Sequence, residues 1–305
     1  MTTSPGARDA HRWAAFGASV RGSAHVREAL PNQDAVGCRS GDSGRWAVTA
    51  VADGHGHSLA VRADRGAHLA VDAALEAARS CWEALRGQAG GFAAAAVAEE
   101  LPTVMATSWM ASVQRDLAEA PLTASELASS GNAEALSSYP ETAYGTTLIV
   151  ALAVAGSIVT CQIGDGDVVA VKRDGTVFRL LPADTRLVGT KTTSLASRSA
   201  LSDFRASHVD VDSEAIEVVV AATDGYVNSF SAEDGFAAAG RDLWRLIHEV
   251  GASSVEGALA SWLESTSTDG TGDDATLAIL FDDVGLEDTV RLPDPGTTIS
   301  DGGIL

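Results

Sequence analysis

The sequence predicts a layered α+β domain, and two observations support this prediction. Short apolar segments bounded by glycine, asparagine and aspartate, which are typical of strands, occur in two groups along the chain. Each group is followed by a pair of helical segments, and a last strand-like segment completes the pattern. No internal repeat and no linker divides the chain. We therefore expect one domain over residues 13–283, with residues 1–12 and 285–305 as flexible tails.

The strands are predicted from apolar runs that end at turn-forming residues. The connections within the second group are too short to hold a crossover helix, so its first four strands are expected to form an antiparallel meander. The expected strands span residues 13–20, 34–39, 46–53, 146–154, 157–163, 168–172, 177–181, 216–222 and 275–281.

The helices are predicted from apolar residues that recur at helical spacing. Ser58 can cap the first helix, and Pro102 is expected to interrupt or restart the second, because proline is best tolerated in the first turn of a helix. Residues 121–143 are expected to form a loop with room for one short helical turn, and residues 182–214 show little pattern. The expected helices span residues 58–86, 92–120, 234–249 and 254–265.

The composition excludes several classes of protein. The 305 residues include 21 lysines and arginines against 41 aspartates and glutamates, a formal charge of −20 that argues against nucleic acid as a partner. The three cysteines are far apart and form no CxxC motif, which is typical of a reducing compartment. The polar start shows no secretory signal, and no apolar run is long enough to span a membrane. We therefore expect a cytoplasmic monomer that does not bind membranes.

Acidic residues stand at the ends of several predicted strands, with glycines beside them. The clearest case is Asp53, which ends a buried apolar run and precedes Gly54. A carboxylate beside an accessible backbone carbonyl suits a hard divalent cation. Acidic residues also stand at the ends of other strands: Asp34, Asp165, Asp167, Asp224, Asp273 and Asp274.

These carboxylates would converge if their strand ends lie at one rim of packed sheets, and their like charges would then repel one another. Divalent cations relieve such repulsion, and carboxylate and water ligands favour Mg²⁺ or Mn²⁺ over Zn²⁺. Two ions about 4 Å apart can generate a hydroxide and stabilise a phosphoryl group during transfer. The acidic residues therefore predict a two-metal site for phosphoryl chemistry.

Six short motifs, in order along the chain, resemble those of the metal-dependent Ser/Thr protein phosphatases of the 2C type (PPM family). The resemblance is greatest to a short bacterial subfamily, and it implies an αββα sandwich in which two antiparallel sheets lie between helix pairs. The motifs are NQDA at residues 32–35, ADGHG at 52–56, GTT at 145–147, IGDGD at 163–167, TDG at 223–225 and DDAT at 273–276.

The resemblance also implies roles for individual residues. A hydroxide that bridges two Mg²⁺ or Mn²⁺ ions would attack phosphorus directly, and His55 would protonate the leaving serine or threonine oxygen. Asp34 would act on the first metal site through water, with a plain cap as the alternative. The metal ligands would be Asp53, which bridges the ions, the Gly54 carbonyl, Asp34, Asp224 and Asp273.

The chain departs from the commonest family pattern at two places that bear on the site. In the commonest form, an arginine shortly before the first acidic motif binds the phosphate. Here that segment is longer, and Arg27, His25 or Arg21 could bind the phosphate instead; Arg27 is preferred. Asn228 stands where many members have an aspartate for a third metal, so a third ion at Asp165 would be weak or absent. Asp165 is equally compatible with a metal role and with a tight hairpin turn. The other two acids, Asp167 and Asp274, are expected to face solvent or to brace the loops.

These features predict a Mg²⁺- or Mn²⁺-dependent phosphoprotein phosphatase, acting on phosphoserine or phosphothreonine in proteins that a bacterial Ser/Thr kinase modifies. The alternative is a catalytically weak or silent phospho-binding module of the same fold, which the altered arginine and Asn228 keep open. The DGHGH sequence also resembles the start of zinc amidohydrolases. That reading requires a parallel barrel with histidines at later strand ends, which this chain does not have.

Overall fold

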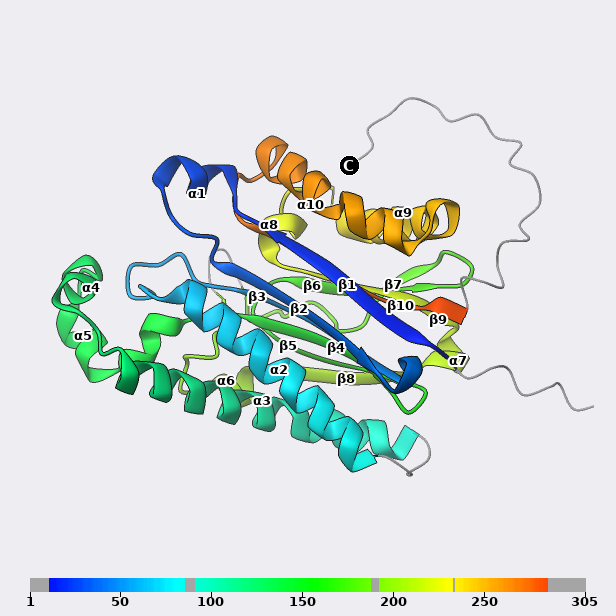
Figure 1. The fold of residues 1–305 in the computed structure, drawn as a ribbon, viewed down its shortest axis with the longest axis horizontal. Coiled ribbons are helices and arrows are strands. Elements are labelled where there is room, and N and C mark those ends of the chain that lie inside the picture. The colour runs from blue at the N-terminus through cyan, green and yellow to red at the C-terminus, as the bar shows by residue number, and fades with distance from the viewer. Residues whose placement is uncertain (1–10, 86–90, 188–191, 233, 285–305) are drawn as a thin grey trace, which may run out of the picture.

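The computed structural model describes residues 11–85, 91–187, 192–232 and 234–284. Two five-stranded antiparallel sheets pack face to face, and helices cover the outer face of each (Figure 1). The predicted αββα architecture is therefore confirmed. None of the helices in these ranges is long and apolar enough to cross a membrane.

The first sheet has the order β2-β3-β4-β5-β8, and helices α2 and α3 cover its outer face (Figure 1). Fully buried alanines of α2, among them Ala67, Ala70 and Ala74, pack in the core beneath it and let the helix lie close to the strands. The elements are β2 (Asp34–Gly41), β3 (Trp46–Asp53), β4 (Leu148–Val154), β5 (Ser157–Ile163), β8 (Arg205–Asp210), α2 (Ala63–Leu85) and α3 (Gly91–Glu119).

The second sheet has the order β1-β10-β9-β6-β7, and helices α9 and α10 cover it. Both faces of its central strands are buried, one against these helices and one against the other sheet. The elements are β1 (Trp13–Val20), β6 (Asp167–Lys172), β7 (Val177–Arg179), β9 (Ile216–Ala222), β10 (Ala275–Asp282), α9 (Gly235–Val250) and α10 (Ala252–Asp269).

The predicted four-strand meander is wrong. Strands β4 and β5 pair in the first sheet, whereas β6 and β7 pair in the second, so the chain passes between the sheets at Gly164-Asp165-Gly166. A connection of three residues excludes a crossover helix, but it does not distinguish a hairpin from a step between stacked sheets. This step places Asp165 at one end of the sandwich.

Several boundaries also differ from the prediction. Helix α2 begins at Ala63 rather than at Ser58, which lies in the turn before it. Helix α3 continues through Pro102, whose neighbours Leu101 and Met105 are fully buried, so packing outweighs the lost hydrogen bond. Residues 121–143, where one short helical turn was expected, hold α4 (Ala124–Ser129), α5 (Ala133–Ser138) and most of η2 (Pro140–Tyr144). Short elements that the sequence did not predict are β8, α1 (Ser23–Glu28), α6 (Ala200–Asp203), α7 (Val211–Glu214), α8 (Asp224–Val227) and η1 (Asp42–Gly44).

The last two residues of the expected N-terminal tail are held in place. His11 Nδ1 lies 2.5 Å from Asp282 Oδ2, and Arg12 Nε donates to Asp283 Oδ2 at 2.9 Å. The hydrogen bond to Asp282 raises the pKa of His11. The prediction of a loose arm is therefore wrong for residues 11–12, while residues 1–10 and 285–305 lie outside the described residues.

A buried arginine joins the helical layer to the loop region that follows α3. The Arg62 side chain is only 5% exposed, and its guanidinium donates to both oxygens of Glu126 at 2.6 and 3.1 Å. It also donates to Tyr144 Oη at 2.6 Å and to the Ala120 carbonyl at 2.7 Å. This network fixes α4 and η2 against the start of α2.

Replacing Arg62 with methionine is expected to lower the free energy of unfolding by about 2 kcal/mol. The loss is smaller than for a fully buried ion pair, because Glu126 reaches solvent and can rehydrate. Urea denaturation monitored by tryptophan fluorescence measures the change. The matched control is Arg65→Met, because Arg65 is half exposed in its pair with Asp116 and should contribute less than about 0.5 kcal/mol. Equal losses in both variants would contradict the prediction.

Candidate active site

The acidic residues predicted to bind metal come from strand ends of both sheets. Asp53 ends β3 and pairs in register with Asp34, the first residue of β2. Asp224 begins α8, with only Thr223 between it and the end of β9, Asp165 lies between β5 and β6, and Asp273 precedes β10. A cavity of about 290 Å³ opens where these ends meet. It is lined by His25, Gln33, Asp53, Gly54, His55, Gly56, His57, Asp165, Thr192, Asp224, Asp273 and Asp274.

Two groups of possible metal ligands lie in this cavity. One oxygen each from Asp53, Asp165 and Asp224 lies within 4.8 Å of the other two. The second group, His25, Asp273 and Asp274, meets the same limit. The structure therefore brings together residues that are up to 249 positions apart in the sequence.

The GTT motif holds the backbone around Asp53. The Asp53 N–H donates to Thr147 Oγ1 at 3.0 Å, and the Asp53 carbonyl accepts from the Thr147 N–H and from Thr146 Oγ1. The His55 N–H donates to the Gly145 carbonyl at 3.0 Å. Since these bonds use backbone atoms of Asp53, its carboxylate can face the cavity.

The other carboxylates are oriented by neutral donors. Asn228 Nδ2 donates to Asp224 Oδ2 at 3.1 Å, and Thr192 Oγ1 donates to Asp165 Oδ1 at 2.9 Å. Asp34 is 2% exposed and accepts from Thr223 Oγ1 at 2.7 Å, so it lies behind the cavity rather than in its lining. None of these bonds neutralises a negative charge.

Burial and mutual repulsion raise the pKa values of three of the acidic groups. Burial is the main cause that raises the pKa of Asp34 to about 8, and nearby Asp274 and Asp273 add to it. Burial, followed by the charge of Asp34, raises the pKa of Asp53 well above its ordinary value. Burial and the charge of Asp165 raise the pKa of Asp224. A divalent cation would favour the ionised form of all of these groups, so the donor set fits such an ion.

Comparison with known proteins identifies the family. The sequence profile of protein phosphatase 2C matches residues 21–264. The chain belongs to the protein phosphatase 2C family. A search of curated protein sequences found no match.

Several solved structures have the same fold, among them two described as serine/threonine phosphatases. PppA of Pseudomonas aeruginosa superposes with a TM-score of 0.54 at 17% identity, covering 88% of this chain and 97% of PppA. Stp1 of Staphylococcus aureus gives 0.55 at 12% identity, covering 91% and 98%. The catalytic domain of PstP, solved with two manganese ions, gives 0.52 at 14% identity, covering 88% and 97%.

Of the two residues predicted to bind the substrate phosphate in this 2C-type site, only His25 lines the cavity. His25 Nδ1 lies 2.8 Å from Asp274 Oδ2, and its Nε2 lies 3.8 Å from Asp273 Oδ1. Arg27 is exposed on α1, does not line the cavity, and lies 3.5 Å from Ser23 Oγ. Among the described lining residues there is no lysine or arginine.

The predicted general acid has an unusual environment. His55 is 8% exposed, and burial lowers its pKa to about 4, with a smaller effect from His57. The two rings stack with centroids 5.6 Å apart. A Cβ on Gly145 would lie 2.8 Å from His55 Cδ2, so glycine at this position leaves room for the ring.

Three residues at the site have a role that the sequence analysis left open or missed. Asp274 braces a loop, because it accepts from the Gly22 N–H at 2.7 Å. Asp167, the first residue of β6, instead pairs with Arg179 of the neighbouring strand β7 at 2.8 Å. Thr192 was missed because it lies in a segment without pattern, and no signal in the sequence marks it. The sequence analysis also missed that the backbone at Gly225 lies close to the backbone at Asp274. A Cβ on Gly225 would lie 2.0 Å from the Asp274 carbonyl oxygen, so only glycine fits there.

Proposed function

We propose that the chain is a Mg²⁺- or Mn²⁺-dependent phosphatase that hydrolyses phosphoserine and phosphothreonine in proteins. The observation that supports this most is the group Asp53, Asp165 and Asp224, in which three carboxylates converge with no lysine or arginine among the described lining residues. Such a group is costly without a cation and is the ligand type that Mg²⁺ and Mn²⁺ prefer.

The proposed ligands follow the motifs. Asp53 and the Gly54 carbonyl would hold the first ion, Asp53 would also reach the second, and Asp224 and Asp273 would complete it, with Asp34 acting from behind the cavity. Asp165 lies within 4.8 Å of Asp53 and Asp224, which supports a direct metal role for it. When bound, the ions would neutralise the phosphate and activate water as the nucleophile.

The protein's own residues would orient the phosphate. His25 lines the cavity between the two aspartates that precede β10, so it is the better placed of the two predicted phosphate ligands. Arg27 would need its long side chain to turn inward from α1. Residues 13–283 would act as one domain and a monomer, on phosphoproteins made by a Ser/Thr kinase.

His55 would donate the proton to the leaving oxygen. The ring is neutral near pH 7 in the free protein, and a phosphate dianion in the cavity would favour its protonated form. We expect His55→Gln to lower kcat on a phosphothreonine peptide about 100-fold, the usual range for a lost general acid. Hydrolysis of p-nitrophenyl phosphate should change little, because nitrophenolate leaves without a proton. His68→Gln, at an exposed residue of α2 outside the cavity lining, is the control and should keep both rates. Equal losses of His55→Gln on the two substrates would contradict the assignment.

The proposed function is tested with a phosphothreonine peptide and p-nitrophenyl phosphate in the presence of Mn²⁺, Mg²⁺, Zn²⁺ or EDTA. We expect turnover with Mn²⁺ or Mg²⁺ and none with EDTA. If calorimetry shows manganese binding but no substrate is turned over, the alternative, a silent phospho-binding module, is favoured. The absence of arginine and lysine from the described lining residues of the cavity also fits that alternative. Activity with Zn²⁺ alone would overturn the proposal.

A further inference from the structure

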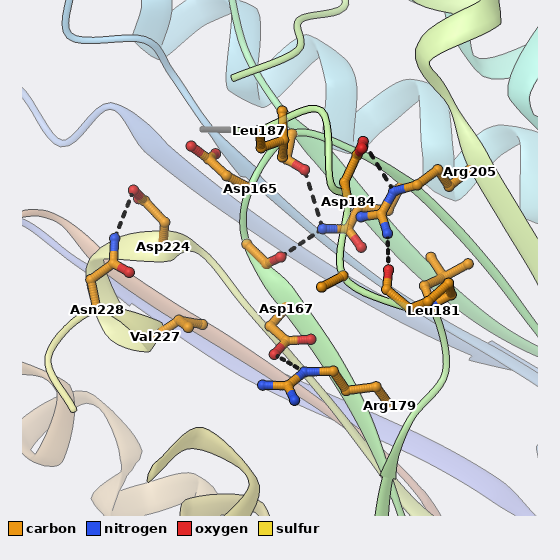
Figure 2. A pocket seen from close by; sticks show the side chains of 15 residues that line it. Asp165, Asp167, Arg179, Leu181, Asp184, Leu187, Arg205, Asp224, Val227 and Asn228 are labelled. Carbon is orange, nitrogen blue, oxygen red and sulfur yellow. Dashed lines mark hydrogen bonds and ion pairs between the residues drawn. The ribbon is translucent and has the colours of Figure 1, made fainter. Parts of the chain in front are cut away.

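We call the cavity of about 290 Å³ at the acidic strand ends the carboxylate cavity, and a second, larger cavity adjoins it. It has a volume of about 610 Å³ and shares Asp165 and Asp224 with it (Figure 2). A third cavity, of about 420 Å³, shares His55, His57 and Thr192 with the carboxylate cavity on another part of its lining. The carboxylate cavity is therefore the middle member of three adjoining hollows, and we name the larger neighbour the flank cavity.

The flank cavity has an aliphatic wall. Val227 of α8 faces it from one side, and the segment after β7 provides the other side (Figure 2). The wall residues that are at least partly exposed are Pro182, Ala183, Leu187 and Val227. The polar and charged lining residues outnumber the aliphatic ones, so the aliphatic residues form one part of the lining. A cavity of this size that combines apolar groups with placed polar groups is typical of a specific binding site.

The charged groups of the flank cavity are largely paired with one another. Arg179 Nε lies 2.8 Å from Asp167 Oδ2, and Arg205 Nε lies 3.5 Å from Asp184 Oδ2. Asp184 also lies 2.7 Å from Arg186. The two remaining carboxylates of the lining, Asp165 and Asp224, belong to the proposed metal site. The cavity therefore offers its aliphatic wall, rather than a free charge, to an occupant.

We propose that the flank cavity binds an aliphatic side chain next to the phosphorylated residue of the substrate protein. This inference rests on the proposed function, because it places the phosphate in the carboxylate cavity. A polypeptide bound there must continue over an adjoining surface, and the flank cavity is the larger hollow that shares residues with it. Among its described lining residues, the third cavity has no aliphatic side chain larger than that of alanine, so it offers a leucine or valine side chain no aliphatic partner of similar size.

The test uses labelled peptides that carry a non-hydrolysable difluoromethylene phosphonate in place of phosphothreonine. Leucine, alanine, aspartate or lysine is placed at each of three positions on either side, and binding in Mn²⁺ is measured by fluorescence anisotropy. At one or two positions on one side, we expect leucine to bind about tenfold more tightly than aspartate, as burial of an aliphatic side chain implies. Aspartate should also be disfavoured by the negative charge of the whole chain.

A matched pair of variants locates the preference. Leu187→Asp places a charge in the wall and should remove the preference for leucine, whereas Thr185→Asp, at an exposed residue outside the lining, should keep it. Both variants should hydrolyse p-nitrophenyl phosphate as the parent does, because this substrate fills only the carboxylate cavity. Uniform binding of all peptides, or a preference that survives in Leu187→Asp, would overturn the inference alone. If no peptide binds and p-nitrophenyl phosphate is not hydrolysed, the proposed function fails with it.

Discussion

Replacing Asp53 with asparagine is expected to lower Mn²⁺-dependent kcat about 1,000-fold. Asp53 is the one carboxylate that the proposed site needs for both ions, and a metal ion contributes several kcal/mol to phosphoryl transfer, at 1.36 kcal/mol for each tenfold in rate. The fold should survive, because the hydrogen bonds that hold this residue use its backbone N–H and carbonyl. Steady-state kinetics on p-nitrophenyl phosphate measures the loss of kcat, and calorimetric titration with Mn²⁺ measures the loss of metal affinity that accompanies it.

The control for this variant is Asp174→Asn. Asp174 lies in an exposed turn, where its carboxylate accepts from the Thr176 N–H at 2.9 Å, so the same chemical change occurs far from the proposed metals. It should leave kcat and manganese affinity unchanged. If Asp53→Asn keeps its rate within about tenfold of the parent, the bridging role assigned to Asp53 is wrong, since losing both ions should cost far more.

Most of the fold could be predicted because its signals are local. Each central strand is a short apolar run ended by glycine or an acid, and α2, α9 and α10 show apolar residues at helical spacing. Sheet membership could not be predicted in this way. Strands β5 and β6 are both apolar on two faces, so the sequence does not indicate that the chain steps from one sheet to the other between them. Packing also kept α3 intact through Pro102, against the local signal.

The candidate site could be predicted at its acids but not at their partners. Asp53, Asp224 and Asp273 stand beside strands and glycines, which marks them in the sequence. Thr192 and Asn228 contact Asp165 and Asp224 through bonds that depend on how distant loops meet, and nothing local predicts this. The sequence also could not predict that Arg27 is exposed, because α1 has no apolar residues at helical spacing that would indicate which side of the helix faces the cavity.

Without metal, the protein is expected to lose stability as pH rises from about 4 to 8, and Asp34→Asn should remove much of this loss. Burial raises the pKa of Asp34 from 3.8 to about 8, so between these values the folded state binds a proton that the unfolded state releases. Stability from this group is complete below pH 3.8 and declines until about pH 8. By linkage, the decline at pH 7 is on the order of 4 kcal/mol.

Asparagine keeps the shape of the side chain and an oxygen that can accept from Thr223 Oγ1, but it has no charge to bury. In EDTA, the variant should therefore unfold at higher urea concentration than the parent at pH 8, and at a similar concentration at pH 4. Added Mn²⁺ should stabilise the parent more at pH 8 than at pH 5, because the carboxylates must lose their protons to bind the ion. A variant that is less stable than the parent at pH 8 in EDTA would show that the Asp34 charge is already compensated in the metal-free protein, and the argument that these buried acids require a cation would fail.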